Sequence, residues 1–280
     1  MNREASWKQE LDIMYHGLAT KGYLWMDKDE LKKVDEALEK NPNDFYLWSA
    51  KGILNFNYDW DEAIRCFNKC LAIQPFNANM YYNRGRKYLS KNAVDHALAD
   101  LTVAFALDPN CNWKAHYVGV AYYLQRNYAE AAKYFKKAME IADHFYGDLY
   151  CCEVDWLWTA YMHMGEVEKA NEIISTVDRS TYIVPVIGDD DGYKNVCLLL
   201  GGHMTLQELL DTLGPQTEGG AVNELYGIAK WFYYVKKDLK SAVDYVQKTL
   251  TFTSKSGAWG YKMAEMDKEA WEAELAAASK

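Results

Sequence analysis

The sequence repeats itself with a period of about 34 residues through much of its first half. Ala63, Ala97 and Ala131 are equally spaced at this period. Other residue types keep the same spacing: Phe67, Leu101 and Phe135; Leu54, Tyr88 and Tyr122; Cys70, Ala104 and Ala138; Pro75 and Pro109. A fixed period of this length is typical of repeat proteins, in which one unit cannot bury its apolar surface alone. The chain is therefore predicted to fold by stacking similar units.

Each unit is expected to form two helices. In the third unit, apolar residues recur in steps of three and four, first at Ala115, Val118 and Tyr122 and then at Ala131, Phe135 and Ala138. Such steps indicate amphipathic helices. Short turns are expected at Asn127 and, in a fourth unit, at Gly165. That unit follows after a longer interval than the others, with Tyr161, Ala170, Ile174 and Val177.

The pattern resembles the tetratricopeptide repeat family. The second unit matches the family's motif with Tyr81, Gly85, Tyr88, Ala97, Leu101, Ala104 and Pro109. The third matches with Val118, Gly119, Tyr122, Ala131, Phe135 and Ala138, and the first with Leu47, Ala50, Leu54, Ala63, Phe67 and Pro75. Three positions depart from the motif: Lys51 replaces a glycine, Asp143 a proline, and Trp158 a small residue.

The resemblance implies an all-α fold, a right-handed superhelical solenoid of antiparallel helix pairs. It also implies that the first helix of each pair lines a concave groove where family members hold peptides or partner helices. We expect an N-terminal helical cap and degenerate repeat over 1–42, four repeats over 43–177, and a divergent helical and loop segment over 178–220. A further helix pair and a C-terminal capping helix are expected over 221–280.

Local signals support helices in these flanking segments. Trp7, Leu11, Met14 and Leu18 form one apolar stripe within residues 4–18, and 29–39 is predicted to be a second helix of the leading unit. Thr205 and Glu208 predict the start of a helix that ends near Leu213. Residues 179–193 are expected to be a loop or short broken helices. Asp267 is expected to cap a last helix that contains Trp271 and Leu275. This order of segments is weakly similar to bacterial tetratricopeptide adaptor proteins, without their lipid-attachment cysteine.

The charge and composition of the chain indicate which kinds of binding partner are expected. The chain has 280 residues, a net charge of −9 and a hydrophobic fraction of 50%. Basic residues do not cluster, so nucleic acid and anionic membranes are not expected partners. The sequence contains neither an apolar stretch long enough to span a membrane nor a secretory signal. Its six cysteines lack a disulfide or metal-type spacing. We therefore expect reduced thiols and a cytoplasmic location.

Projection of the helices gives a set of candidate groove residues, mostly aromatic with few charges. They are Phe45, Trp48, Asn55, Tyr82, Asn83, Arg86, Trp113, His116, Tyr117, Tyr123, Asp155, Trp156, Thr159 and His163, with Ser49 and Phe56 beside them. Aromatic residues and arginine dominate interface energies. The alternative is that some of them pack on neighbouring helices. A two-carboxylate clamp is not expected, although Asn83 suits one of its positions and Arg86 suits a single carboxylate.

The sequence predicts a protein- or peptide-binding scaffold rather than an enzyme. It contains no catalytic or metal-binding motif, and the acidic run at 189–191 lacks the glutamate that would complete a calcium loop. We expect no catalytic residue, no cofactor and no metal. Alternatives left open are a peptide-sensing regulator, self-association through incompletely capped ends, and an enzyme with a site between the repeat block and the C-terminal segment.

Overall fold

The structure is a computed structural model that describes residues 28–142, 147–181, 192–213, 221–253 and 257–278. The chain forms two compact units, residues 1–141 and 142–280. The boundary falls inside the expected repeat block, so the fourth helix pair belongs to the second unit. The stripe at 4–18, the acidic run at 189–191 and the break at 214–220 lie outside the described residues.

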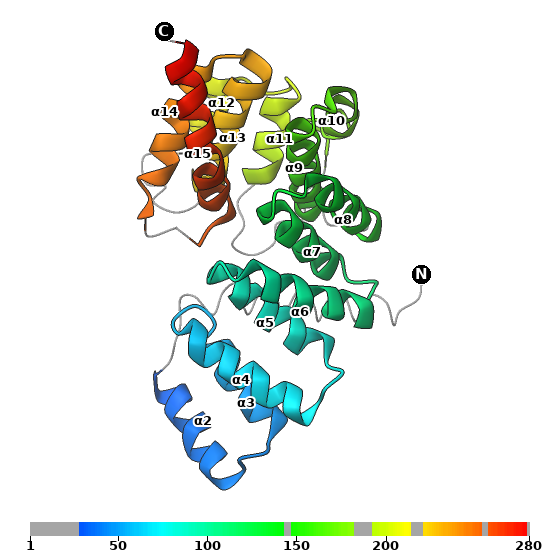
Figure 1. The fold of residues 1–280 in the computed structure, drawn as a ribbon, viewed down its shortest axis with the longest axis vertical. Coiled ribbons are helices and arrows are strands. Elements are labelled where there is room, and N and C mark those ends of the chain that lie inside the picture. The colour runs from blue at the N-terminus through cyan, green and yellow to red at the C-terminus, as the bar shows by residue number, and fades with distance from the viewer. Residues whose placement is uncertain (1–27, 143–146, 182–191, 214–220, 254–256, 279–280) are drawn as a thin grey trace. The chain divides into compact units, whose positions relative to one another are not determined.

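The first unit consists of successive helices joined by short turns (Figure 1). They are α2 (Lys28–Lys40), α3 (Phe45–Leu54), α4 (Trp60–Ile73), α5 (Ala78–Ser90), α6 (Val94–Leu107), α7 (Asn112–Leu124) and α8 (Tyr128–Ile141). The pairs α3–α4, α5–α6 and α7–α8 each pack closely, as the three complete repeats predict. The described ranges contain helices and turns but no strand. The prediction of an all-α fold built from helix pairs is confirmed.

The repeated sequence pattern marks the core of these pairs. The alanines at 63, 97 and 131 are fully buried, and so are the large apolar residues Phe67, Leu101 and Phe135. The turns repeat as well: Asn92 and Arg126 are one period apart, with φ angles of 58° and 59°. This left-handed conformation reverses the chain between two helices within a few residues. In the fourth pair, Gly165 occupies the corresponding turn with φ 72°.

Glycines on the first helices allow the two helices of a pair to approach. A Cβ atom on Gly119 would lie 2.6 Å from Phe135, and one on Gly85 would lie 2.8 Å from Leu101. In the first repeat this role falls to Gly52, where a Cβ atom would lie 2.6 Å from Phe67. The glycine is therefore shifted by one residue, and the departure at Lys51 does not disturb the packing of the pair.

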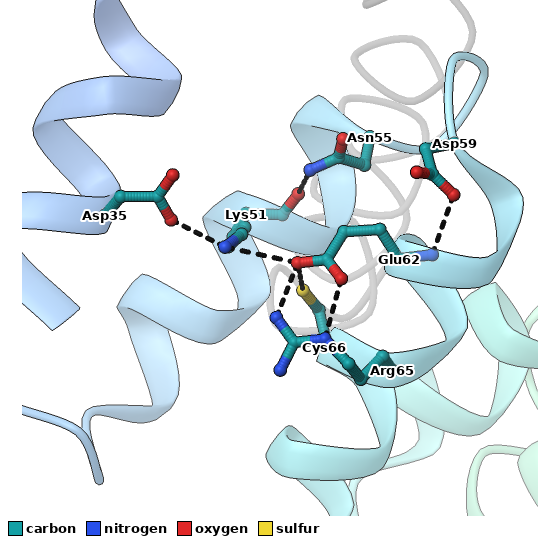
Figure 2. A network of polar contacts seen from close by, with 7 residues as sticks. All are labelled: Asp35, Lys51, Asn55, Asp59, Glu62, Arg65 and Cys66. Carbon is teal, nitrogen blue, oxygen red and sulfur yellow. Dashed lines mark hydrogen bonds and ion pairs between the residues drawn. The ribbon is translucent and has the colours of Figure 1, made fainter.

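Lys51 instead joins α2 to the α3–α4 pair, as Figure 2 shows. Its Nζ lies 2.5 Å from Asp35 on α2 and 3.1 Å from Glu62 on α4. Glu62 also accepts hydrogen bonds from the Arg65 guanidinium at 2.5 and 2.6 Å. The backbone N–H of Glu62 donates to Asp59, which caps α4. These contacts form a polar network where α2 meets the α3–α4 pair.

The network should make the stability of the first unit depend on acidic pH. Hydrogen bonds from Arg65, with a further contribution from Lys51, lower the pKa of Glu62 from 4.5 to about 2. A carboxylate with a depressed folded-state pKa stabilises the fold above pH 4.5, and this stabilisation is lost as pH falls toward 2. We expect Glu62→Gln to lower the free energy of unfolding of the first unit by about 1 kcal/mol at pH 6 and by little at pH 2. Urea unfolding at both pH values measures this, with the exposed Glu39→Gln as control. An equal loss at both pH values would contradict the charge-based account.

The second unit contains α9 (Gly147–His163), α10 (Val167–Ile174), α11 (Gly192–Leu200), α12 (Leu206–Leu213), α13 (Ala221–Lys230), α14 (Leu239–Leu250) and α15 (Trp259–Ala278). A π-helical turn, η2 (Trp231–Lys236), continues α13. The α9–α10 and α13–α14 pairs lie where a fourth repeat and a further helix pair were expected. Thr205 and Glu208 cap α12 reciprocally, at 2.7 and 3.2 Å, as predicted.

Two local predictions for this unit differ from the structure. Asp267 does not cap the last helix, because α15 begins at Trp259 and buries Asp267 in its interior. There its carboxylate accepts a hydrogen bond from Tyr226 at 2.6 Å. Within the expected helical and loop segment over 178–220, no helix was predicted at the position of α11, whose apolar run from Val196 to Leu200 packs against α9 and α13. That run was visible in the sequence, but its short length did not indicate a helix.

Candidate protein-interaction site

The candidate groove residues of the second and third repeats gather around one arginine. The Arg86 guanidinium carbon lies 4.9 Å from the Phe56 ring centre, 5.4 Å from Tyr82 and 5.0 Å from Tyr117. These distances are within the range of cation–π attraction. Arg86 and Tyr82 come from α5, Tyr117 from α7, and Phe56 from the turn before α4. We call Phe56, Tyr82, Arg86, Trp113, His116 and Tyr117 the Arg86 cluster.

Aromatic contacts within this cluster join the first helices of two consecutive repeats. Tyr82 and Tyr117 meet edge to face, with ring centres 5.5 Å apart. Trp113 and His116 lie 6.4 and 5.2 Å from the same Tyr117 ring. Edge-to-face pairs are favoured by the ring quadrupoles. The structure thus brings together the α5 and α7 candidates Tyr82, Arg86, Trp113, His116 and Tyr117. Their binding role stays a prediction.

Two buried lysines beside the cluster were not among the candidates. Lys87 donates to the Phe56 carbonyl at 2.7 Å, and its Nζ lies 3.6 Å from the Phe56 ring centre. Burial, together with the nearby charge of Arg86, lowers the pKa of Lys87 to about 6. Lys114 is paired with Asp108 at 3.0 Å. Arg86 therefore supplies the positive charge of the cluster, while the Lys114 side chain beside it is engaged with Asp108.

The candidates on α3 make contacts within their own repeat. Trp48 donates from Nε1 to the Pro42 carbonyl at 2.8 Å, and the Arg65 guanidinium lies 5.1 Å from its ring. Phe45 packs on the core cluster around Phe67. Asn55 donates to the Lys51 carbonyl at 2.9 Å and ends the helix. Phe45 and Trp48 thus pack on the same hydrophobic cluster as Phe56, and the hydrogen bonds and ring contacts described do not join them to Arg86, Tyr82 or Tyr117.

The remaining candidates of the first unit lie on α5 and α7. Asn83 is buried on α5, one residue after Tyr82. Tyr123, near the end of α7, is 1% exposed and meets Tyr128 edge to face at 5.1 Å. Tyr123 therefore packs against the start of α8, inside its own repeat.

The candidates on α9 belong to buried networks of the second unit. Asp155 pairs with Lys230 of α13 at 2.5 Å, and Thr159 accepts from the same Nζ at 3.0 Å. All three side chains are buried. Trp156, which is 1% exposed, packs against Trp259. A peptide would reach these residues only if α13 or α15 moved. Lys230 was missed because its partner is distant in sequence.

His163 lies between two partners from later helices. Its Nδ1 is 3.3 Å from the Tyr234 hydroxyl, and its Nε2 is 3.8 Å from Asp267. Trp158, the large residue at the usual glycine position, packs edge to face on Tyr234 of η2. The π-helical turn thus fills the space beside a first helix that lacks the small residue.

The geometry does not assemble a metal site in the described part of the chain, where no group of three or more ligating side chains lies together. The same part contains no helix that is long and apolar enough to cross a membrane. All six cysteines are buried, and burial raises the pKa of the Cys66 and Cys70 thiols to about 12. Thiols with such pKa values are poor nucleophiles at neutral pH.

Comparison with known proteins agrees with the fold. Residues 115–145 match the tetratricopeptide repeat family. The Cut9–Hcn1 hetero-tetramer of the APC/C contains a chain with a TM-score of 0.55 and 16% identity, over 88% of this chain and 46% of that one. PilF of Pseudomonas aeruginosa matches with a TM-score of 0.50 and 14% identity, over 90% of this chain and 96% of the PilF chain. No curated protein matches the sequence. The comparisons thus show one tetratricopeptide repeat at residues 115–145 and a fold of stacked helix pairs that is shared with these structures.

Proposed function

We propose that this chain is a protein-interaction module that binds a peptide segment of a partner protein across α5 and α7. The observation that carries the proposal is the Arg86 cluster, in which two consecutive first helices gather largely buried aromatic rings around one guanidinium, so that a bound segment would contact the edges of the cluster. Large aromatic side chains offer contact area at low entropic cost, and arginine adds directional hydrogen bonds. The tetratricopeptide fold supports the same function, because its stacked first helices form an extended surface.

The chemistry of the cluster indicates what kind of segment would bind. Rings from Tyr82, Trp113 and Tyr117 favour apolar or aromatic side chains, while Arg86 favours a carboxylate. The proposed ligand is therefore a mixed segment, apolar with at least one acidic residue. A binding role is favoured over catalysis because the cluster contains no activated nucleophile. The cytoplasmic location and the scaffold role are parts of the same proposal.

Substitution of the cluster should weaken partner binding strongly. We expect Arg86→Ala and Tyr117→Ala each to reduce affinity for a selected peptide at least about tenfold, since central aromatic and arginine contacts dominate interfaces. A displayed library of random peptides selects the ligand with the unaltered chain, and fluorescence anisotropy then measures Kd. Tyr46→Ala is the matched control, because Tyr46 is an aromatic residue that is 77% exposed at the start of α3. Equal Kd values for all four proteins would contradict the proposed site.

A further inference from the structure

The outer face of α6 is exposed and uncharged along most of the helix. Residues at steps of three and four share this face, which we call the α6 stripe: Ala99, Thr102, Val103, Ala106 and Leu107. Val103 and Leu107 are 39% and 40% exposed, although both are large apolar residues. The buried residues of α6 lie on its opposite side. An exposed apolar helix face of this kind suits contact with another helix.

Basic side chains border the α6 stripe on the two neighbouring second helices. Because α4, α6 and α8 occupy the same place in successive repeats, residues one repeat period apart correspond to one another. The positions that correspond to Ala99, Thr102 and Val103 are mostly basic and all exposed: Arg65, Asn68 and Lys69 on α4, and Lys133, Lys136 and Lys137 on α8. In a chain with a net charge of −9, this border is a local excess of positive charge.

Two of these lysines are available to a partner. Arg65, Lys133 and Lys137 pair with glutamates of their own helices. Lys69 and Lys136 take part in no ion pair within the described part of the chain. The uncharged stripe therefore has an uncompensated cation on either side.

Side-chain contacts tie α6 to both of its neighbours. Arg84 of α5 donates to Asn68 on α4 at 2.6 Å and to Asp100 on α6 at 2.7 Å. The Phe105 ring on α6 lies 5.9 Å from the Tyr134 ring on α8. The stripe and its basic borders thus belong to one packed layer of the first unit.

The second unit carries a surface of similar shape and opposite charge on α15. Residues at steps of three and four share one face of this helix, which we call the α15 stripe: Met266, Ala270, Ala273 and Ala277. The three alanines are exposed and Met266 is half-buried. Glu265 and Glu269 border the stripe on one side and Glu274 on the other. The half-buried Lys262 lies one turn before it.

The carboxylates beside the α15 stripe differ in their contacts. Glu274 accepts a hydrogen bond from Tyr233 at 2.8 Å. Glu265 and Glu269, both exposed, take part in no ion pair within the described residues. They are the acidic counterparts of Lys69 and Lys136 on the first unit.

The two stripes also match in length and in the size of their side chains. The α6 stripe extends for about 12 Å and the α15 stripe for about 17 Å. Alanine and threonine side chains let two helix axes approach to about 8 Å. At that separation the lysines beside one stripe can reach the glutamates beside the other, so the charged borders are complementary.

We propose that α15 of one copy of this protein docks on α6 of a second copy. The contact joins two different surfaces, so each copy in a pair keeps one further surface of each kind. Such contacts build open chains or closed rings. The Arg86 cluster lies on the first helices α5 and α7, outside this contact, and the proposal does not depend on it.

The first test reverses the charges beside each stripe in the full chain. The unaltered chain is expected to show an average mass that rises with its concentration in analytical ultracentrifugation. Lys69→Glu with Lys136→Glu should weaken this association at least about tenfold, and so should Glu265→Lys with Glu269→Lys. Mixing these two variants should restore association, because each supplies the surface that the other lacks.

Matched controls make the same charge changes elsewhere. Lys33→Glu with Lys40→Glu alters exposed lysines of α2, and Glu168→Lys with Glu172→Lys alters exposed glutamates of α10. Both are expected to associate like the unaltered chain. An unaltered chain of constant mass at every concentration overturns the proposal, and so does a mixture of the two stripe variants that stays monomeric. Loss of association in Arg86→Ala would place the contact at the Arg86 cluster instead and would also overturn it.

The second test locates the contact by cross-linking. The six native cysteines are buried, so single exposed cysteines can be introduced as reactive sites. A chain with Val103→Cys is mixed with a tagged chain carrying Ala273→Cys, and a short bis-maleimide is added. We expect the mixed dimer to exceed either homodimer several-fold. Homodimers of the Val103→Cys chain in equal yield would indicate an α6-to-α6 contact and overturn the proposed pairing.

Discussion

Replacing Lys230 with methionine should lower the stability of the second unit by about 3–5 kcal/mol. The Lys230 ammonium group is 1% exposed and pairs with the buried carboxylate of Asp155 at 2.5 Å. Methionine keeps the length of the side chain but removes the charge, so Asp155 is left buried without its counter-charge. Amide hydrogen exchange of α9 and α13 in increasing urea measures the loss for this unit separately from the first.

The control for this variant is Lys169→Met. Lys169 pairs with Glu166 at 2.8 Å, but 56% and 43% of the two side chains are exposed. Such an exposed ion pair contributes less than about 1 kcal/mol to the free energy of unfolding. We also expect the double variant Asp155→Leu with Lys230→Met to recover much of the stability lost by Lys230→Met, because no unpaired charge remains. A double variant as unstable as the single one would assign the loss to packing rather than to the charge.

The second large effect is expected in the third repeat. Gly119→Ala should destabilise the first unit by about 1–3 kcal/mol, because the new Cβ atom would lie 2.6 Å from the Phe135 ring. Either the ring or one of the two helices has to shift. The loss appears as faster exchange of the α7 and α8 amides.

Gly257→Ala is the matched control, since a Cβ atom there meets no heavy atom within 4 Å. A double-mutant cycle with Phe135→Val tests the cause directly. We expect Gly119→Ala to lower the free energy of unfolding clearly less in a chain that carries Phe135→Val, because the contact between the new Cβ atom and the ring is then absent. An unchanged cost would mean that the loss of glycine itself, rather than the clash, controls stability.

Some of the candidate groove residues could be grouped correctly from the sequence, and others could not. Tyr82, Arg86 and Tyr117 were found together because helical spacing and the repeat period fix which first-helix residues are neighbours. Trp48 was placed in the same groove by the same projection. In the structure its ring lies against Arg65 and its indole donates to Pro42, a contact that depends on local rotamers.

The sequence by itself determined the helix pairs of the repeats, their turns and their core. Periodic alanines and large apolar residues have a single buried arrangement when each unit stacks on the next, so pattern and fold coincide. Only the tertiary structure decided that Gly52 replaces the missing glycine, that Asp267 is buried against Tyr226, and that Asp155 pairs with Lys230. Such contacts join side chains from distant helices, and their partners depend on how helices without a regular repeat pack in space.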